Sequence, residues 1–317
     1  MAPPLPPLAA AQGLLFGLAL GDALGWPVEF LDLAAIRARY GPAGIQQPPD
    51  PAVYTDDTQM TIALAEGLLE AGPAADLDAQ MAAVARRFIA WSRHPETPTT
   101  APGGTCLRGV AALEAGAPWR TAGVAGSKGC GACMRVAAVG YLYQHDPERL
   151  RAVALAQGWL THRHPASDAA CVAAAWLVKL ALDGAPPADW LSATQAVTRG
   201  LSPDFDAALE RAAEAMPWDD ERRALDHIGP VRGGGWIAEE AVALALYCAV
   251  RRPDDYVAAV RLGANITGDS DSVAAIAGGV IGARLGPAAV PEAWRARLRH
   301  RAELHALAVR LAQTRRE

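Results

Sequence analysis

Patterns typical of β-strands are nearly absent from this sequence. Runs in which Val, Ile or Thr alternate with polar residues are scarce, and aromatic residues make up only 6% of the chain. Hydrophobic residues nevertheless occupy 51% of the 317 positions, and many of them are alanines. Alanine has the highest helix propensity, and its small side chain lets helices pack closely. The composition therefore argues against an all-β protein and predicts an all-α fold with a large buried core.

No lysine-rich run or basic stripe is present. The chain has 29 Lys and Arg residues against 34 Asp and Glu residues, which gives a formal net charge of -5. Proteins that grip duplex DNA neutralise many phosphates with basic side chains. The most basic segment, 295–316, has its arginines at helical spacing among alanines and leucines, as in a solvated helix face. We therefore do not expect the protein to bind duplex DNA.

Cysteines are few and odd in number. The five are Cys106, Cys130, Cys133, Cys171 and Cys248. An odd count in a long chain argues against the disulfide framework of a secreted protein and favours a reducing compartment, so we expect a cytoplasmic protein. The Cys-x-x-Cys pair at 130 and 133 has no second pair and no βαβ context. A glycine-rich ligand loop is therefore favoured over a redox pair or a zinc site.

Long uninterrupted apolar runs are also missing. Segment 8–20 is apolar enough to resemble a signal peptide, but only the terminal amine precedes it as a positive charge, and it continues directly into Gly21 and Asp22. Elsewhere, no stretch of about 20 apolar residues is free of a charge or a helix breaker. We therefore expect no membrane span.

Apolar residues instead recur three and four positions apart, in segments bounded by Gly, Pro, Asp and Ser. After a proline-rich leader over 1–7, this spacing predicts a single domain over 8–317, because the break at 184–187 is short and similar helices follow it. No repeat of fixed period is present. The predicted helices are Leu8–Gly25, Thr58–Ala71, Asp78–Ser92, Met134–Gln144, Pro147–Thr161, Pro165–Leu182, Trp236–Val250, Ser270–Leu285 and Pro291–Thr314.

Two acidic turns precede apolar helices at distant points of the chain. The first, YTDDTQM, places Asp56 and Asp57 after Thr55, and the second, TGDSDS, contains Asp269 and Asp271. By itself each turn is explained by helix capping, because acids near a helix N-terminus are stabilised by the helix dipole. If the turns met, however, four carboxylates would need cations between them. Hard oxygen ligands without a Cys or His set favour Mg²⁺ or Mn²⁺ over zinc.

Two further acids lie near the N-terminus. In GLALGDALGWPVEF, Asp22 interrupts an apolar helix between glycines, and Glu29 follows the predicted helix end. For Asp22, two interpretations stay open: a site residue, or a buried acid hydrogen-bonded to backbone groups. Glu29 comes at a position from which a loop can carry it toward a metal site.

Three loops that interrupt the helical pattern are rich in glycine, namely 102–105, 123–132 and 229–235. Glycine allows backbone N–H groups to approach a ligand closely, as binding of anionic phosphates requires. Residues 126–129 resemble a fragment of a phosphate loop, but the spacing of a Walker motif and a preceding strand are missing. A nucleoside triphosphatase is therefore not expected.

Five short motifs follow one another along the chain. They are GDALG at 21–25 with Glu29, TDDT at 55–58, GACMR at 131–135, WIAEEA at 236–241 and GDSD at 268–271. Each motif alone is weak, but their order resembles that of the ADP-ribosylglycohydrolase family over residues 17–286. This family includes the ADP-ribosyl-acceptor hydrolases and the dinitrogenase reductase-activating glycohydrolases.

The resemblance implies a compact, single-domain orthogonal helix bundle with two Mg²⁺ or Mn²⁺ ions in a central cleft. It also implies hydrolysis of the glycosidic bond between ADP-ribose and an N- or O-linked acceptor by metal-activated water. Asp57 is the expected base, with Asp56 and Asp269 as alternatives, and Glu29 would move aside for substrate. The metal ligands implied by motif are Thr55, Asp56, Asp57, Asp269, Asp271 and Ser272. The implied substrate-binding residues are Gly103, Ser127, Lys128, Gly129, Cys130, Gly131, His162 and Trp236.

Several of these positions have a second interpretation. His162 also fits a solvated residue near a helix C-terminus, and Trp236 fits a core aromatic residue. Glu239 and Glu240 are interpreted as first-turn acids of an amphipathic helix.

Of three departures from the family pattern, Ser272 keeps a hydroxyl and should preserve metal binding, and the other two concern the acceptor more than the ADP-ribose. Ser272 stands where threonine is usual, Lys128-Gly-Cys replaces Gly-Asn-Gly, and Ala138 replaces a frequent proline. The alternatives to hydrolysis of ADP-ribose linkages are a non-catalytic ADP-ribose-binding or structural protein on the same scaffold, and a metal-dependent phosphoesterase. The sequence leaves the acceptor and the oligomeric state open.

Overall fold

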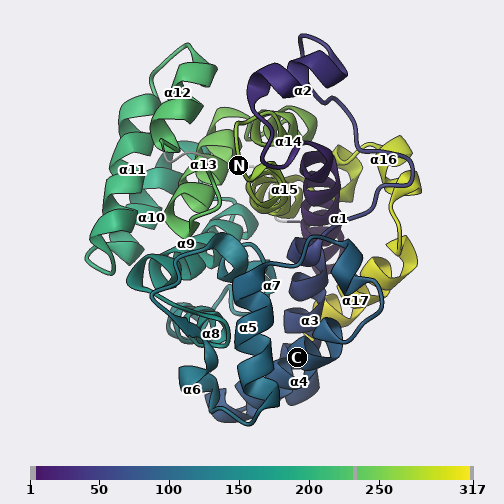
Figure 1. Ribbon diagram of the computed structural model, residues 1–317, viewed down its shortest axis with the longest axis vertical. Coiled ribbons are helices and arrows are strands. Elements are labelled where there is room, and N and C mark those ends of the chain that lie inside the picture. Colours follow the sequence, from purple (N-terminus) through teal and green to yellow (C-terminus); the bar gives the residue numbers. More distant parts are fainter. Residues whose placement is uncertain (1–4, 231–233, 315–317) are drawn as a thin grey trace.

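The computed structural model describes residues 5–230 and 234–314, and Figure 1 shows them as a bundle of helices. Within these residues the helices are α1 Pro7–Gly25, α2 Leu33–Tyr40, α3 Asp56–Ala71, α4 Leu77–Ser92, α5 Gly104–Glu114, α6 Trp119–Ala122, α7 Ala137–Leu142, α8 Pro147–Trp159, α9 Pro165–Leu182, α10 Trp190–Thr198, α11 Pro203–Ala215, α12 Glu221–Ile228, α13 Ala238–Arg251, α14 Tyr256–Ala264, α15 Ser270–Leu285, α16 Glu292–Arg297 and α17 Arg301–Thr314. The all-α prediction is confirmed.

Short elements connect these helices. The 3-10 helices in the described residues are η1 Trp26–Val28, η2 Thr97–Thr99, η3 Cys130–Ala132, η4 Pro187–Asp189 and η5 Pro287–Ala289. Two-residue strands β1 Val124–Ala125 and β2 His162–Arg163 pair in parallel, with Val124 opposite His162. This pairing joins the glycine-rich segment after α6 to the segment between α8 and α9.

Helices α1 and α15 pack closely along each other in the middle of the bundle (Figure 1). α1 carries a glycine at every fourth position from Gly13 to Gly25, and this face lies against α15. A Cβ at Gly17 would lie 2.3 Å from the Gly278 carbonyl oxygen, and one at Gly25 would lie 2.4 Å from Asp271 Cα. Only glycine permits such an approach of two backbones. The packing brings the end of α1 against the start of α15.

Two helical segments are long and apolar enough to cross a membrane, Pro7–Val28 and Pro165–Leu182. In the most apolar 18 residues of each segment, 83% of the residues of the first and 78% of those of the second are buried inside the protein. Burial in the core accounts for the apolar character of both segments. Of the predicted leader, residues 1–4 lie outside the described residues, and α1 begins at Pro7.

The prediction of one helix over Pro291–Thr314 is wrong. The structure has α16 and α17 there, separated by His300 in a left-handed conformation with a φ of 59°. Arg299 N donates to the Ala52 carbonyl oxygen at 3.0 Å, and Ala52 N donates to Arg297 O at 3.0 Å. These bonds to a distant segment draw the backbone out of the helix.

The predicted helix Met134–Gln144 is also shorter in the structure. Only α7 is helical there, because η3 and a turn precede it. Similarly, α8 ends at Trp159, and the chain then enters β2.

Candidate active site

The first turns of α3 and α15 meet inside the bundle. Ser272 Oγ donates to Asp57 Oδ1 at 3.4 Å, which joins the two turns directly. Thr55 is the N-cap of α3 and accepts from Asp57 N, while Asp269 is the N-cap of α15 and accepts from Ser272 N. The capping interpretation is therefore correct for both turns, and the turns also come together as expected.

Asp22 fixes the start of α3. Its carboxylate accepts hydrogen bonds from the backbone N–H groups of Thr55 and Thr58, at 2.9 and 3.1 Å, and from the Thr58 hydroxyl at 2.5 Å. Burial raises the pKa of Asp22 to about 6, and these hydrogen bonds oppose the shift. The structure thus supports the interpretation of Asp22 as a buried acid with backbone partners.

Glu29 reaches the second acidic turn from the segment after η1. Carboxylate oxygens of Glu29, Asp269 and Asp271 all lie within 4.8 Å of one another. The next residue, Phe30, has a φ of 56° and donates its N–H to the Gly268 carbonyl oxygen at 2.6 Å. A non-glycine residue in this conformation is strained, and such strain is often found at functional sites. The contact ties the Glu29 segment to the Asp269 turn.

These carboxylates are buried next to one another, and their pKa values are raised. Burial, with added repulsion from neighbouring acids, raises the pKa of Glu29 to about 8 and that of Asp56 to about 7. The pKa values of Asp57, Asp269 and Asp271 are also raised, chiefly by burial. Loss of water and like charge both oppose ionisation. A bound cation would instead favour the ionised form of these carboxylates.

The donor set fits a hard metal ion. Asp57 Oδ2 is buried and has no hydrogen-bond partner within the described residues, although buried polar atoms normally have one. Ser272 Oγ contacts the other oxygen of Asp57, and the carboxylates of Glu29, Asp56, Asp269 and Asp271 line the same cavity. Carboxylate and hydroxyl oxygens are the ligands that Mg²⁺ and Mn²⁺ prefer. This acidic group can therefore hold a metal ion.

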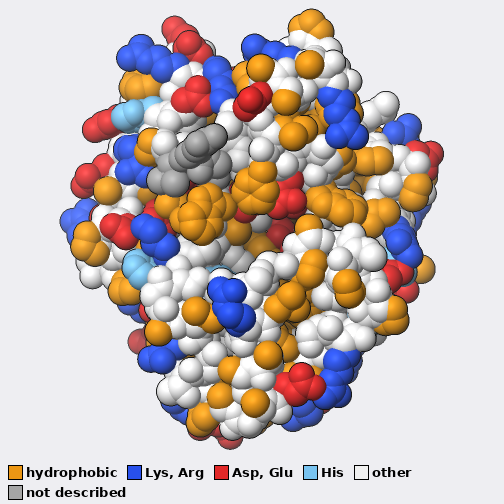
Figure 2. Space-filling model, viewed as in Figure 1, with side chains coloured by type: hydrophobic (Ala, Val, Ile, Leu, Met, Phe, Trp, Pro, Cys, Tyr) orange, Lys and Arg blue, Asp and Glu red, His pale blue; other side chains and the backbone are white. Residues whose placement is uncertain are grey.

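The acids open into a cavity of about 520 Å³, within the usual size range of ligand sites. Its walls contain the acids of both turns together with glycine-rich backbone from two loops. The lining residues are Glu29, Phe30, Asp56, Asp57, Ala101, Pro102, Gly103, Gly104, Thr105, Cys106, Ser127, Gly129, Cys130, Gly131, Met134, His162, Trp236, Asp269, Asp271 and Ser272. Figure 2 shows acidic atoms within a hollow near the centre of this face, bordered by hydrophobic groups.

The glycine-rich loops lie tightly against the acids and against β2. Gly103 N donates to Asp56 Oδ2 at 2.9 Å, and Cys130 Sγ donates to Asp269 Oδ2 at 3.2 Å. A Cβ at Gly131 would lie 2.6 Å from Cys106 Sγ and 2.9 Å from His162 Cε1. A side chain at Gly131 would therefore force its neighbours apart and narrow the cavity. All five cysteines are free, so the Cys-x-x-Cys segment forms no disulfide.

His162 lies on β2, is buried, and lines the cavity. Its interpretation as a solvated residue near a helix end is therefore wrong. Arg135 Nη2 donates to Thr161 Oγ1 at 2.9 Å, and Thr161 Oγ1 lies 2.9 Å from His162 Nδ1. Because Thr161 Oγ1 already accepts from Arg135, this arrangement favours a hydroxyl proton directed at Nδ1 and the tautomer with the ring proton on Nε2. Burial, followed by the charge of Arg135, lowers the pKa of His162 to about 3, so the ring is neutral.

Two predicted site residues do not line the cavity. Thr55 is fully buried as the α3 cap, where its hydroxyl oxygen accepts from Asp57 N. Lys128 turns away and forms ion pairs with Glu239 and Asp204. Glu239 is in the first turn of α13, as predicted, but it is only 2% exposed. Lys128 thus attaches the glycine-rich loop to α13.

Trp236 and Phe30 form exposed aromatic parts of the cavity wall. Among the described residues, they are the exposed large hydrophobic side chains, at 45% and 57%. The interpretation of Trp236 as a core residue is therefore wrong. The Trp236 carbonyl oxygen accepts from Cys130 N at 2.9 Å, which holds it beside the loop.

Some residues of the site were not found from the sequence. Phe30, Ala101 and Cys106 line the cavity, but none belongs to a pattern with a chemical signature. Ala101 also has a positive φ, at 52°, immediately before the predicted glycine-rich loop. The four-residue spacing of glycines in α1 was a visible signal for close helix packing. Arg135 supports His162 through Thr161, and this contact between distant residues has no signal in the sequence.

The described residues thus form an all-α protein with an acidic, ligand-sized cavity able to hold a metal ion. The ADP-ribosylglycohydrolase family profile matches residues 4–317. The ADP-ribosyl-[dinitrogen reductase] glycohydrolase of Rhodospirillum rubrum is 29% identical over 295 residues, which cover 91% of this chain and 90% of the relative. The ADP-ribosylarginine hydrolase Tri1 of Serratia proteamaculans is 27% identical over 292 residues, which cover 90% of this chain and 74% of the relative.

A solved structure described as an ADP-ribosylglycohydrolase-related protein complex has the same fold. It superposes with a TM-score of 0.75 at 28% sequence identity, covering 98% of this chain and 99% of the other. The chain therefore belongs to the ADP-ribosylglycohydrolase family and is a glycoside-hydrolysing enzyme. The family resemblance found in the sequence is confirmed.

Proposed function

We propose that this enzyme releases ADP-ribose from a modified acceptor in a reaction that depends on divalent metal ions. The observation that carries the proposal is the meeting of two acidic turns in one cavity, where Ser272 contacts Asp57 and Glu29 joins Asp269 and Asp271. Five carboxylates facing one ligand-sized space are difficult to explain by helix capping alone. Membership of the ADP-ribosylglycohydrolase family supports the same activity.

The proposed metal ions are two Mg²⁺, with Mn²⁺ as a substitute. The proposed ligands are Thr55, Asp56, Asp57, Asp269, Asp271 and Ser272. When bound, the ions would lower the pKa of water and neutralise the buried acids. Among the ligands, Asp57 has a buried oxygen without a partner in the described residues, which supports its place in the set.

The protein's own groups would orient the substrate and move protons. Asp57 is proposed to accept the proton from the attacking water, and the nearby carboxylates would stabilise positive charge developing on the sugar. His162, with its ring proton on Nε2, would donate a hydrogen bond to an oxygen of the bound ADP-ribose. Gly129 and Gly131 would let the phosphate groups approach the backbone closely.

We further propose arginine as the modified acceptor residue. Phe30 and Trp236 are exposed aromatic side chains in the cavity wall, and a guanidinium plane stacks well on such rings. The name of one relative, ADP-ribosylarginine hydrolase, agrees with this assignment.

A product analysis on defined linkages tests the proposed function. Peptides carrying ADP-ribose on arginine or serine, and O-acetyl-ADP-ribose, are incubated with the enzyme in Mg²⁺ or in a chelator. We expect the enzyme to release intact ADP-ribose from the arginine peptide in Mg²⁺ and not in the chelator. Release of AMP would instead identify a phosphoesterase, and binding without turnover of any linkage would identify a non-catalytic protein. Cleavage confined to an O-linked substrate would overturn the arginine assignment.

A further inference from the structure

A second cavity, of about 420 Å³, lies where α2, α12, α13 and α14 come together. Its lining includes Arg37, Arg222, Arg252 and Arg261 against one acid, Glu221. None of its lining residues belongs to the catalytic cavity. Four arginines around one cavity stand out in a chain with a net charge of -5.

The positive charges of this arginine cavity are only partly neutralised. Arg222 pairs with Asp226, and Arg252 pairs with Glu221. Within the described residues, the Arg37 side chain has no ion pair and no hydrogen bond. Arg261 likewise has no carboxylate partner there, and its Nε donates to the Gln46 carbonyl oxygen at 2.8 Å. Both guanidinium groups therefore keep N–H donors for a ligand.

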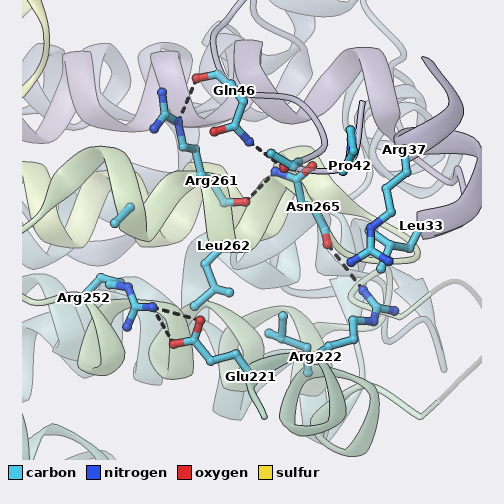
Figure 3. Close-up of a pocket in the computed structure, with 13 residues that line it drawn as sticks. Leu33, Arg37, Pro42, Gln46, Glu221, Arg222, Arg252, Arg261, Leu262 and Asn265 are labelled. Atoms are coloured by element: carbon cyan, nitrogen blue, oxygen red, sulfur yellow. Dashed lines mark hydrogen bonds and ion pairs between the residues drawn. The ribbon is translucent and has the colours of Figure 1, made fainter. Parts of the chain in front are cut away.

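The arginines occupy two ends of the cavity. Figure 3 shows the side chains of Arg37 and Arg222 pointing toward each other at one end. At the other end, Arg252 pairs with Glu221 and the Arg261 side chain points toward Gln46, with Leu262 between the two arginines. Guanidinium groups that point toward each other repel unless an anion lies between them. Planar guanidinium groups also match phosphate and carboxylate oxygens in bidentate geometry.

We propose that the arginine cavity binds a small molecule with an oxyanion group, phosphate or carboxylate, at each of its two ends. A volume of about 420 Å³ suits a ligand larger than a single inorganic phosphate. The apolar residues between the charged ends would contact the middle of such a molecule. Binding at this cavity does not depend on the proposed function of the catalytic site.

The arginine cavity is connected to the catalytic acids through two segments. Arg37 belongs to α2, which directly follows the Glu29–Phe30 segment. Arg222 donates to Thr267 Oγ1 at 3.0 Å, in the loop that leads into the Asp269 turn. Phe30 N and Gly268 O join these same two segments. An anion held between Arg37 and Arg222 would therefore restrain the position of Glu29, and the two sites would influence each other's affinity.

Calorimetric titration of the full-length, metal-free chain tests the site. The probes are fructose 1,6-bisphosphate, citrate and inorganic phosphate at fixed ionic strength, and the absence of metal removes the cations that would hold them in the catalytic cavity. We expect the bisphosphate to bind more tightly than inorganic phosphate and to bind at least about tenfold more weakly to Arg37→Gln, because a charged hydrogen-bond donor is lost. Tighter binding of citrate than of bisphosphate would identify a carboxylate ligand instead of a phosphate ligand.

Arg39→Gln is the matched control. Arg39 lies on the same helix, donates to the Pro27 carbonyl oxygen, and does not line the cavity. We expect wild-type affinity in this variant. Equal weakening in both variants would show a general charge effect, and binding of no probe by the wild type would remove the site; either result overturns the proposal.

The coupling has its own test, which rests on the proposed function. The hydrolysis rate at low substrate concentration is measured with and without the bisphosphate, in the wild type and in Arg37→Gln. We expect a rate change of at least twofold in the wild type and none in the variant. An equal change in both proteins, or no change in the wild type, would contradict coupling while leaving the binding result intact. Failure of hydrolysis under all conditions would contradict the proposed function alone.

Discussion

Ser272 Oγ donates a hydrogen bond to Asp57 Oδ1 at 3.4 Å, across 215 positions of sequence. This contact makes one site out of two helix caps that are each unremarkable alone. It exists because α1 and α15 pack backbone against backbone, and because Asp22 on α1 holds the first turn of α3. The geometry of the acids thus depends on the glycines of the central helix pair.

Neighbouring glycines of α15 test this dependence on packing. A Cβ at Gly278 would lie 2.3 Å from the Gly17 carbonyl oxygen, whereas one at Gly279 would lie 3.4 Å from Leu18 Cβ. We expect Gly278→Ala to lower the free energy of unfolding by about 1–3 kcal/mol through overpacking. Gly279→Ala is the control and should change it by less than about 1 kcal/mol. Denaturant unfolding measures both, and equal effects would contradict the packing argument.

The raised pKa values of the acids predict an unusual dependence of stability on pH. Glu29 and Asp56 keep their protons in the folded protein up to about pH 8 and 7, but lose them near pH 4 when unfolded. Their contribution is therefore fully present below pH 4 and is lost as pH rises through 7 to 8. Without metal, we expect the melting temperature to fall between pH 5 and pH 8.

Divalent metal should reverse this trend, because it binds the ionised acids more tightly as pH rises. The measurement is thermal unfolding at pH 5 and pH 8, in a chelator and in Mg²⁺. A metal-free melting temperature that rises toward pH 8 would contradict the burial of these acids.

The hydrogen bonds around His162 predict an effect of the neighbouring threonine. In Thr161→Val the hydroxyl beside Nδ1 is lost, so the tautomer with the ring proton on Nε2 is no longer favoured. We expect mixed tautomers by ¹⁵N NMR and a KM for substrate about tenfold higher. Thr161→Ser keeps the hydroxyl and should restore both. A single Nε2–H tautomer in the valine variant would show that Thr161 does not set the ring proton.

Lys128 allows a structural role to be distinguished from a role in substrate binding. Its ion pair with Glu239 is partly buried, so Lys128→Met leaves a buried carboxylate without its cation. We expect a loss of about 1–2 kcal/mol of stability, after allowing for solvent screening, and a KM within about threefold of wild type. Adding Glu239→Gln should recover part of the stability. A large rise in KM at unchanged stability would instead place Lys128 in the substrate site.

Much of the local structure follows from the sequence. The residues Thr55, Asp56 and Asp57 predict a helix start because capping depends on neighbours in the chain. The contact of Ser272 with Asp57 is different, since it depends on the packing of α1 against α15. It could be inferred only from matching chemistry and from the family resemblance. The buried partners of Arg135 likewise could not be predicted from local sequence patterns.

The features that the sequence did not reveal have a common physical origin. The break at His300 arises from backbone bonds between the C-terminal segment and Ala52. Lys128 forms ion pairs with Glu239 and Asp204, which are distant in sequence, and it does not line the cavity. The arginine cavity is lined by side chains from separate helices, so no single segment of the sequence predicts it. Long-range contacts decide these features, and one sequence contains little information about them.

The central claim is that acids from both turns bind divalent metal together, and equilibrium binding of Mn²⁺ tests it most directly. The number of ions bound is measured for the wild type, Asp57→Asn and Asp271→Asn near pH 8, with circular dichroism to confirm the fold. We predict two ions per wild-type chain and weaker binding, by at least about tenfold for one ion, in each variant. Absence of Mn²⁺ binding by the folded wild type, or unchanged binding in both variants, would contradict the account.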